Sequence, residues 1–296
     1  MRLKELDVPF AAVVTDIDLR GLDVEAFAEL HASWLEHPLL IFPGQHLDQA
    51  EQDTFARRFG DLEFEAVAMS NIRPDGTVES NPDDDLVKSL RGNEGWHHDS
   101  TFMPVQSKGA VLSAEIVPDE GGDTGWADMR TAYEALDDQT RELVADKAAS
   151  HSMTYSQRRA GYLPKKVVQD DGIQLYGYPD GDVPLRPLVK VHPETGRPNL
   201  IVGRHAHDVV GMSPDESERL LDRLNEAATA PDNVHFHHWT AGDVVMWDNR
   251  RLVHRVTPYD MTQPRQLWHT RIAGDPATEA ALNHPAVAHT ASSSQH

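Results

Sequence analysis

The chain has 296 residues, of which 39% are hydrophobic and 7% aromatic, a composition that supports a folded core in one large domain or two small ones. Its net charge of −21 argues against nucleic acid and anionic membrane surfaces as partners, because both repel an acidic protein. Cysteine is absent, which excludes disulfides, thiolate metal sites and thiol nucleophiles and fits a reducing cytoplasm.

Short apolar strands and amphipathic helices alternate in the first part of the chain. The periodicity predicts a strand over 11–19, a helix over Val24–Leu35, a short buried strand over 38–44 that ends at Pro-Gly, and a second helix over Asp48–Phe59. Residues 70–95 are polar and rich in turn-forming residues. They predict a long mobile loop, and long loops in compact domains are often active-site lids.

The remainder of the chain consists mostly of short apolar segments separated by turn residues. A strand over 105–117 is followed by the turn-forming EGGDTG and by a helix through Arg130–Ala149, and residues 155–185 form an irregular insertion. Five more strands are expected, at 188–192, 200–203, 233–239, 243–247 and 265–273.

This order of elements favours a mainly β fold with helices, namely a jelly-roll core with helical decoration and a long active-site loop. No internal repeat and no flexible linker divides the chain, so residues 1–285 are expected to form a single domain. The tail, residues 286–296, is expected to be disordered.

The sharpest local signal is GWHHDSTF at 95–102. Side chains alternate across a strand, so His97 and Asp99 would point to one face and His98 to the other. The best candidate for a third ligand is His254, which follows the strand that ends in Trp247-Asp248. Two histidines and one carboxylate on one face leave three positions of a metal open, as in non-haem Fe(II) oxygenases.

Other histidines compete with this assignment, because a single HxD is a weak signal in a chain with 17 histidines. His192-Pro193-Glu194 is an HxE, but it lies in a turn, and Pro193 would interrupt a strand ladder there. Two histidine pairs remain: His235 with His237, which share a strand face without a nearby carboxylate, and His205 with His207, which fit either a pocket or the surface.

An arginine and a threonine support the metal assignment. Arg265 follows His254 after the turn VTPYDMTQP, on a strand that returns beside the metal. There it can form a bidentate salt bridge with the distal carboxylate of a 2-oxo diacid, whose other end could chelate iron. Thr124 in GGDTGW offers a hydroxyl as a second contact.

With these residues the chain resembles the family of taurine dioxygenase and 2,4-dichlorophenoxyacetate dioxygenase, over roughly residues 5–280. The stretches MPVQSKGAVLSAE, VPLRPLVKVHPETGR, VGRHAH and DMTQPRQLWHTRIAGD are similar to its aryloxyalkanoate branch. Six motifs carry the family resemblance in order: LLIFPGQ (39–45), WHHDSTF (96–102), VPDEGGDTGWADM (117–129), HPETGR (192–197), WDNRRLVHR (247–255) and RIAGD (271–275).

The resemblance implies a double-stranded β-helix, another name for the jelly roll. It implies that iron is held by His97, Asp99 and His254, and that 2-oxoglutarate is held by Arg265 and Thr124.

Three further residues are candidates for substrate contact. The family's loop asparagine corresponds to Asn93. The arginine with which taurine dioxygenase binds the substrate sulfonate is replaced here by His269, which makes taurine a doubtful substrate. Arg271 lies two residues further on. On a strand Arg265, His269 and Arg271 share one face, so either of the last two could meet an anionic substrate, or Arg271 could form a structural ion pair.

The implied enzyme is a dioxygenase that uses Fe(II), 2-oxoglutarate and O2 and releases succinate and CO2. Its expected substrate is a small anionic molecule, an aryloxyalkanoate-type carboxylic acid whose ether is cleaved after hydroxylation. The alternatives are an alkyl sulfate or sulfonate dioxygenase of the same family, a zinc-dependent hydrolase with the same three ligands, and a non-catalytic metal-binding jelly roll.

The expected setting of the protein is the cytoplasm. The chain has no apolar run long enough for a membrane span, and its first residues lack a basic stretch followed by an apolar one, so no secretory signal is expected. Neither a nucleic-acid nor a membrane partner is expected, and a homo-oligomer is left open.

Overall fold

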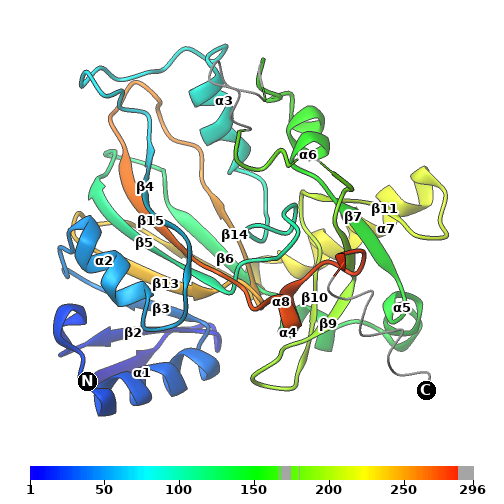
Figure 1. Cartoon of the computed structure of the whole chain (residues 1–296), viewed down its shortest axis with the longest axis horizontal. Coiled ribbons are helices and arrows are strands. Elements are labelled where there is room, and N and C mark those ends of the chain that lie inside the picture. The colour runs from blue at the N-terminus through cyan, green and yellow to red at the C-terminus, as the bar shows by residue number, and fades with distance from the viewer. Residues whose placement is uncertain (166, 168–174, 180, 286–296) are drawn as a thin grey trace.

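A seven-stranded sheet forms the larger half of the protein in the computed structural model, which describes residues 1–165, 167, 175–179 and 181–285 (Figure 1). In spatial order its strands are β1 (Arg2–Glu5), β2 (Ala11–Thr15), β3 (Leu39–Phe42), β13 (Val244–Asp248), β5 (Gly109–Ile116), β15 (Gln266–Ile272) and β4 (Leu62–Ser70). Neighbours pair antiparallel, except that β2 and β3 are parallel. Strands from both ends of the chain therefore lie side by side.

A smaller sheet packs on the larger one. Its strands are, in order, β12 (Val234–His237), β6 (Thr124–Asp128) and β14 (Leu252–Val256). The core between the sheets joins Trp126 of β6 and Leu252 of β14 to Leu112, Trp247 and Leu267 of the larger sheet. Two packed antiparallel sheets with an apolar core are the predicted jelly roll, and the prediction of a mainly β fold with helices is confirmed.

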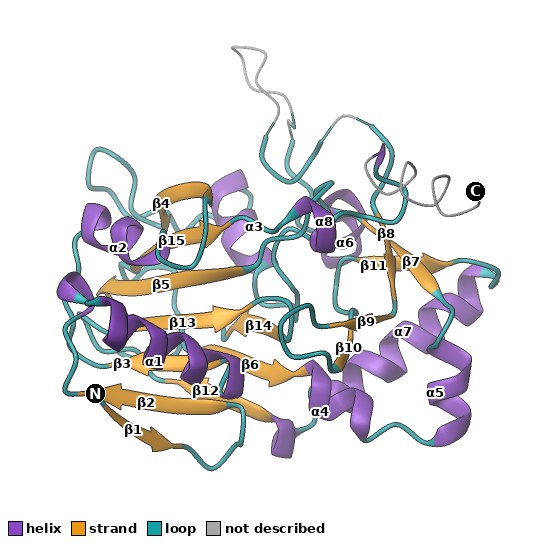
Figure 2. Ribbon diagram, turned by 60° about the horizontal axis from the view of Figure 1, so that its bottom comes forward, coloured by secondary structure: helices purple, strands orange, loops and turns teal. Residues whose placement is uncertain are grey.

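The central strands are buried on both faces, which explains why they read as continuous apolar runs. In β13, Val245 and Trp247 point into the core between the sheets. Val244 and Met246 point to the other face, where they join a second cluster with Trp34. Two helices cover that face (Figure 2), α1 (Val24–Glu36) and α2 (Gln49–Ala56).

A second group of elements extends from one end of the jelly roll (Figure 2). Its apolar cluster contains Leu188, Leu200 and Leu224. Its strands are β7 (Ala148–His151), β8 (Leu185–Pro187), β9 (Val189–Val191), β10 (Pro198–Leu200) and β11 (Ala206–Val209). Its helices are α4 (Met129–Glu134), α5 (Asp138–Val144), α6 (Met153–Ala160) and α7 (Pro214–Ala228), and α8 (Pro276–Glu279) lies nearby.

Two expected segments differ in the structure. The loop predicted over 70–95 contains a helix, α3 (Asp85–Gly92), which begins where the Asp84 side chain accepts a hydrogen bond from Leu86 N. The helix predicted through Arg130–Ala149 is two helices followed by β7. It is interrupted because Asp137 caps a new helix, its side chain accepting from Thr140 N.

Other differences concern elements that the sequence analysis left irregular. The insertion 155–185 overlaps α6, and part of it, with the tail 286–296, lies outside the described residues. The elements that were not expected are β1, β4, β6, β7, β8, β11, β14, α7 and α8. Within the described part of the chain, the structure contains no helix of the length and apolar character that crossing a membrane requires.

Candidate active site

His97 and His254 are brought together by a single backbone bridge rather than by the strand expected over 95–102. His97 N donates to His254 O (3.0 Å) and His254 N donates to His97 O (2.9 Å). On β14, Leu252 belongs to the core between the sheets. Val253 belongs instead to the apolar cluster of Leu188, Leu200 and Leu224 at the end of the jelly roll. Because side chains alternate along a strand, His254 points with Leu252 into the jelly roll.

Asp99 is fixed through its backbone by Asn249, a buried residue that the sequence analysis did not single out. Asp99 N donates to Asn249 Oδ1 (2.7 Å), and Asn249 Nδ2 donates to Asp99 O (2.9 Å). His98 turns away, with its Nδ1 2.8 Å from Asn249 O. One ligand atom each from His97, Asp99 and His254 therefore lies within 4.8 Å of the others.

The protonation states of these three groups suit a divalent metal. Burial lowers the pKa of His97 to about 4, and burial together with the nearby His97 lowers the pKa of His254 well below its usual value. Burial by itself would raise the pKa of Asp99, but Arg271, His254 and His269 together hold it well below its usual range. Neutral imidazoles and an ionised carboxylate are the forms that bind metal, so the residues fit an iron site.

Arg265 is a buried cation with no carboxylate within ion-pair distance among the described residues. Its Nη2 donates to Gly122 O (2.8 Å), and its buried Nε has no partner there. Burial lowers the pKa of Arg265 to about 10, so its charge is costly without an anion. A Cβ at Gly122, whose φ is +69°, would lie 2.9 Å from Arg265 Nε, so only glycine leaves room for the guanidinium group.

Thr124 lies on β6 and points to the same interior as Trp126. Its Oγ1 accepts a hydrogen bond from Trp239 Nε1 (2.9 Å). A hydroxyl that accepts from the indole keeps its own proton free to donate to a carboxylate.

All the predicted site residues line one cavity of about 80 Å3: Asn93, His97, Asp99, Thr124, His254, Arg265, His269 and Arg271. Its remaining wall consists of Met69, Leu90, Leu112, Trp247, Val256, Tyr259 and Leu267. A closed apolar wall with a few convergent polar groups is typical of a small-molecule site.

The two candidates for substrate contact on β15 differ in their surroundings. His269 lies 3.5 Å from Asp99 Oδ2 through its Nε2, and its ring stacks on Trp247. Arg271 is ion-paired with Asp99, its Nη2 lying 2.8 Å from Oδ1. That either residue contacts substrate stays a prediction.

Two residues of the VGRHAH motif lie next to the metal-ligand cluster. The buried ring of His205 is 5.7 Å from that of His97, and no described residue hydrogen-bonds to its Nε2. Arg204 donates to Gln157 Oε1 (2.5 Å) and Ser156 Oγ (3.3 Å), with no carboxylate of the described residues at ion-pair distance. The signal that could have identified them was the similarity of this motif to the aryloxyalkanoate branch.

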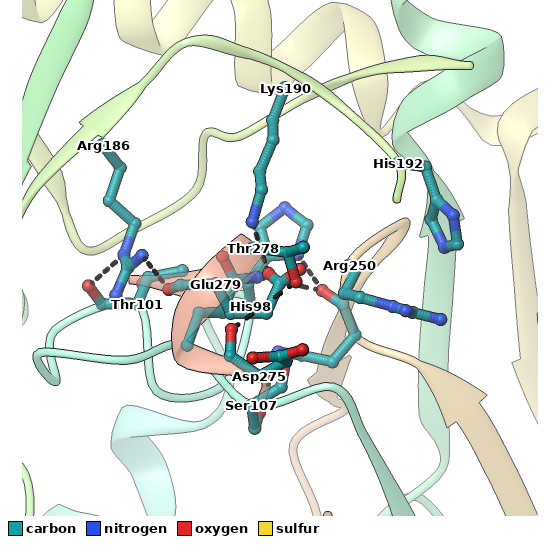
Figure 3. A network of polar contacts seen from close by, with 12 residues as sticks. His98, Thr101, Ser107, Arg186, Lys190, His192, Arg250, Asp275, Thr278 and Glu279 are labelled. Carbon is teal, nitrogen blue, oxygen red and sulfur yellow. Dashed lines mark hydrogen bonds and ion pairs between the residues drawn. The ribbon is translucent and has the colours of Figure 1, made fainter. Parts of the chain in front are cut away.

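A polar network beyond the site holds the loop that follows Asp99 (Figure 3). Arg186 donates to Thr101 O (2.8 Å), Met103 O (2.7 Å) and Glu279 O (2.9 Å). The carboxylate of Glu279 in turn pairs with Lys190. The loop is thus fastened to α8 and to β8 and β9.

Of the competing histidines, His205 lies beside His97, whereas His192 and His237 pair with carboxylates outside the metal-ligand cluster. His192 binds Asp248 (3.0 Å), which also pairs with Arg250 (2.6 Å), in a buried structural cluster. His237 pairs with Asp243 (3.1 Å), at a distance from the metal ligands in the fold.

A jelly roll that holds two histidines, one carboxylate and an unpaired arginine in one cavity has the arrangement of a non-haem iron oxygenase. The family described as "Taurine catabolism dioxygenase TauD, TfdA family" matches residues 2–272, and the chain belongs to it. It is an Fe(II)- and 2-oxoglutarate-dependent dioxygenase with O2 as co-substrate. The resemblance stated from the sequence motifs is therefore confirmed.

Individual relatives agree with this assignment. The (S)-phenoxypropionate/alpha-ketoglutarate-dioxygenase of Sphingobium herbicidovorans is 55% identical over 94% of this chain and 97% of its own length. The alpha-ketoglutarate-dependent 2,4-dichlorophenoxyacetate dioxygenase of Cupriavidus pinatubonensis is 35% identical over 87% of this chain and 92% of its own. The crystal structure of AAD-2 in complex with Mn(II) and N-oxalylglycine superposes with a TM-score of 0.85 at 35% identity, covering 95% of this chain and 100% of AAD-2.

Proposed function

We propose that this enzyme cleaves 2-aryloxyalkanoic acids, with an (S)-2-phenoxypropionate-type acid as its substrate. The observation that carries the proposal is the identity of 55% and 53% to two (S)-phenoxypropionate/alpha-ketoglutarate-dioxygenases, each aligned over more than nine tenths of this chain. An alkylsulfatase is 33% identical and the structure of a taurine dioxygenase 26%. These lower values support the aryloxyalkanoate over the sulfate and sulfonate alternatives.

In this proposal His97, Asp99 and His254 hold Fe(II), and Arg265 with Thr124 receives the distal carboxylate of 2-oxoglutarate. The bound iron and 2-oxoglutarate supply oxidative decarboxylation and the transfer of one oxygen atom to a substrate carbon. The chain keeps water out through the apolar cavity wall and orients the substrate. Family membership also favours a dioxygenase over a zinc hydrolase and a non-catalytic metal-binding protein.

The substrate carboxylate needs a cation, and Arg204 is the arginine that we assign to it. Arg265 serves the co-substrate and Arg271 is paired with Asp99. Arg204 has no ion-pair partner among the described residues and its charge acts on the nearby His97. Its side chain lines a neighbouring hollow beside Gly95 and Trp96, not the cavity of the metal ligands. Asn93 and His269, which line the cavity, then contribute hydrogen bonds to the same substrate.

Hydroxylation at the carbon that bears the ether oxygen makes the product unstable. One oxygen atom of O2 enters succinate and the other forms the new C–OH bond. The new hydroxyl then loses its proton, a carbonyl forms, and the bond between that carbon and the ether oxygen breaks, so that the aryloxide leaves and takes up a proton. A 2-aryloxypropionate, 2-oxoglutarate and O2 thus yield a phenol, pyruvate, succinate and CO2.

The test compares phenol release from a 2-aryloxypropionate with sulfite release from taurine and sulfate release from an alkyl sulfate, which also yields an aldehyde, all with Fe(II), ascorbate and 2-oxoglutarate. We expect phenol and succinate in equal amounts, with the (S) enantiomer preferred. Sulfite, or aldehyde with sulfate, without phenol would assign the enzyme to a sulfur-substrate branch. Turnover that continues without O2 and 2-oxoglutarate would instead identify a hydrolase.

A variant tests the proposed anchor. Arg204→Gln should raise the KM for the aryloxypropionate by about 30-fold or more, because losing a charged partner costs roughly 2 kcal/mol or more. The affinity for 2-oxoglutarate should not change, because Arg265 is intact. An unchanged substrate KM would mean that His269 or Arg271, and not Arg204, binds the substrate carboxylate.

A further inference from the structure

Arg271 is held on several sides in the structure. Its Nη2 donates to Asp99 Oδ1 (2.8 Å), and its Nη1 donates to Tyr176 Oη (2.7 Å) and Ser100 Oγ (3.1 Å). The guanidinium carbon lies 4.7 Å from the centre of the Phe64 ring. These contacts engage both terminal nitrogens of the guanidinium group, and only its buried Nε has no hydrogen-bond partner among the described residues.

Glu63 completes the arrangement from β4. Tyr176 Oη donates to Glu63 Oε1 (2.8 Å), and Ser100 Oγ donates to Glu63 Oε2 (2.8 Å). Tyr176 lies in the insertion, Glu63 on β4 and Arg271 on β15, so segments distant in sequence meet at the turn after Asp99. We refer to Glu63, Ser100, Tyr176 and Arg271 as the Asp99 clamp.

Ser100 has a left-handed backbone conformation, with φ at +56°. For a residue other than glycine this conformation is strained, because the Cβ atom crowds the backbone. The Ser100 hydroxyl lies within hydrogen-bond distance of Glu63, Tyr176 and Arg271, and these contacts offset the strain. The clamp therefore also fixes the backbone turn that follows Asp99.

The two carboxylate oxygens of Asp99 are therefore unequal. Oδ1 accepts from Arg271 and lies 3.9 Å from His97 Nε2. Oδ2 has no hydrogen-bond donor among the described residues and lies 3.8 Å from His254 Nε2 and 3.5 Å from His269 Nε2. We propose that Arg271 is a positioning residue: it keeps Oδ1 in a hydrogen bond, so that Asp99 coordinates the metal through Oδ2 only. The inference rests on the metal site of the proposed function.

Coordination through one oxygen has a chemical purpose. A carboxylate that bound through both oxygens would occupy one of the positions that a facial triad leaves open for co-substrate and O2. A charge-assisted bond to Arg271 disfavours that second contact. Tyr176 Oη donates to Glu63 and accepts from Arg271. These two hydrogen bonds hold the guanidinium group against Asp99.

Co(II) binding tests the clamp without turnover. Arg271→Lys keeps the charge but cannot reach Asp99, Ser100 and Tyr176 together, and Tyr176→Phe removes only a hydroxyl. Matched controls are Arg57→Lys, which alters an exposed ion pair with Glu65 (2.8 Å), and Tyr133→Phe, whose ring packs beside Arg141 on another surface. Circular dichroism confirms that each variant is folded.

We expect Arg271→Lys to weaken Co(II) binding by about 10- to 100-fold, as loss of an outer contact to a metal ligand typically does. Tyr176→Phe should give a smaller loss in the same direction. In both variants the visible d–d band of bound Co(II) should lose intensity, because a second carboxylate oxygen raises the coordination number. Both controls should match the wild type.

The outcomes separate the two hypotheses. A wild-type protein that fails to bind Co(II) would refute the metal site itself. A wild type that binds, with variants of equal affinity and spectrum, would refute the clamp. Unchanged Co(II) binding with a raised substrate KM in Arg271→Lys would make Arg271 the substrate anchor instead. If Arg271→Lys does not fold, the spectrum of Tyr176→Phe decides.

Discussion

His254 and His98 are both buried histidines near Asp99, yet their environments give them different roles. His254 lies on the inner side of β14, in the same direction as Leu252. His98 points to Asn249 and supports the loop from behind. Burial lowers the pKa of each, so both stay neutral near neutral pH. The direction in which each side chain points, and not its protonation state, therefore decides which of the two histidines can bind the metal.

This difference predicts opposite effects of two substitutions. His254→Ala should abolish 2-oxoglutarate turnover and Fe(II) binding, because only two ligands remain, while circular dichroism still shows a folded protein. His98→Ala should retain metal binding and lose stability. Succinate formation and metal content after dialysis measure the difference. Near-normal turnover in His254→Ala would remove it from the ligand set.

Arg265 provides a second prediction at this scale. Because the only hydrogen bond of its side chain in the described structure is to Gly122 O, Arg265→Ala should weaken 2-oxoglutarate binding by roughly 2–5 kcal/mol. The visible band of the anaerobic Fe(II)–2-oxoglutarate complex should then need much more 2-oxoglutarate to appear. Superimposable titrations of variant and wild type would assign the carboxylate contact to another residue.

Individual elements show which parts of the fold the sequence could predict. β3 and β13 were located because they are apolar on both faces. α7 was missed, although Ser213 and Glu216 form a capping box around Pro214 and mark its start. β4 was missed because alternate residues are only partly buried, and its Glu63 and Glu65 obscure the pattern.

The candidate site was more predictable than the elements, because its residues belong to motifs with fixed spacing. The contacts that support it were not predictable. Asn249 meets Asp99 across 150 positions in the sequence, and Tyr176 reaches Arg271 from an insertion with no periodic pattern. Such contacts depend on the path of loops, which local propensity does not determine.

The small helix α8 is held in place by its last residue, Glu279. Glu279 is 1% exposed and pairs with Lys190, and its backbone oxygen receives bonds from Gln106 N and Arg186. Lys190→Met should lower the free energy of unfolding by about 3–5 kcal/mol, because it leaves a buried carboxylate unpaired.

The matched control is the double variant Lys190→Met with Glu279→Gln, which removes both charges. It should recover part of the loss in urea denaturation. If the single variant is as stable as the wild type, the pair does not hold α8, and Arg186 alone fastens the loop after Asp99.

For the whole molecule, charge is distributed unequally between surface and interior. The net charge is −21, yet the cavity contains the unpaired Arg265, and Arg204 lies nearby. Interior cations can bind anions despite an acidic surface, because low-dielectric walls concentrate the local field. The acidity of the chain therefore describes its surface and does not predict a cationic substrate.

The interior also holds six buried histidines whose pKa burial lowers: His97, His98, His151, His205, His254 and His269. In the unfolded chain each would titrate near about 6.5. Below that pH the unfolded state binds protons that the folded state excludes, so stability must fall as pH decreases. For His97 and His98 the loss continues until about pH 4, where the folded state also takes up the proton.

The expected result is a steep acid dependence in the metal-free protein. His97 and His98, whose folded pKa is about 4, each contribute about 1.4 kcal/mol per pH unit below about pH 6.5. These two alone should lower the free energy of unfolding by about 4 kcal/mol between about pH 7 and pH 5, and the other buried histidines add to the fall. Asp99 and Asp248, whose pKa values lie below the usual range, lose their contribution only below about pH 4. Urea denaturation after treatment with a chelator measures the slope. A free energy that stays constant over this range would mean that the imidazoles are hydrated or charged in the folded state.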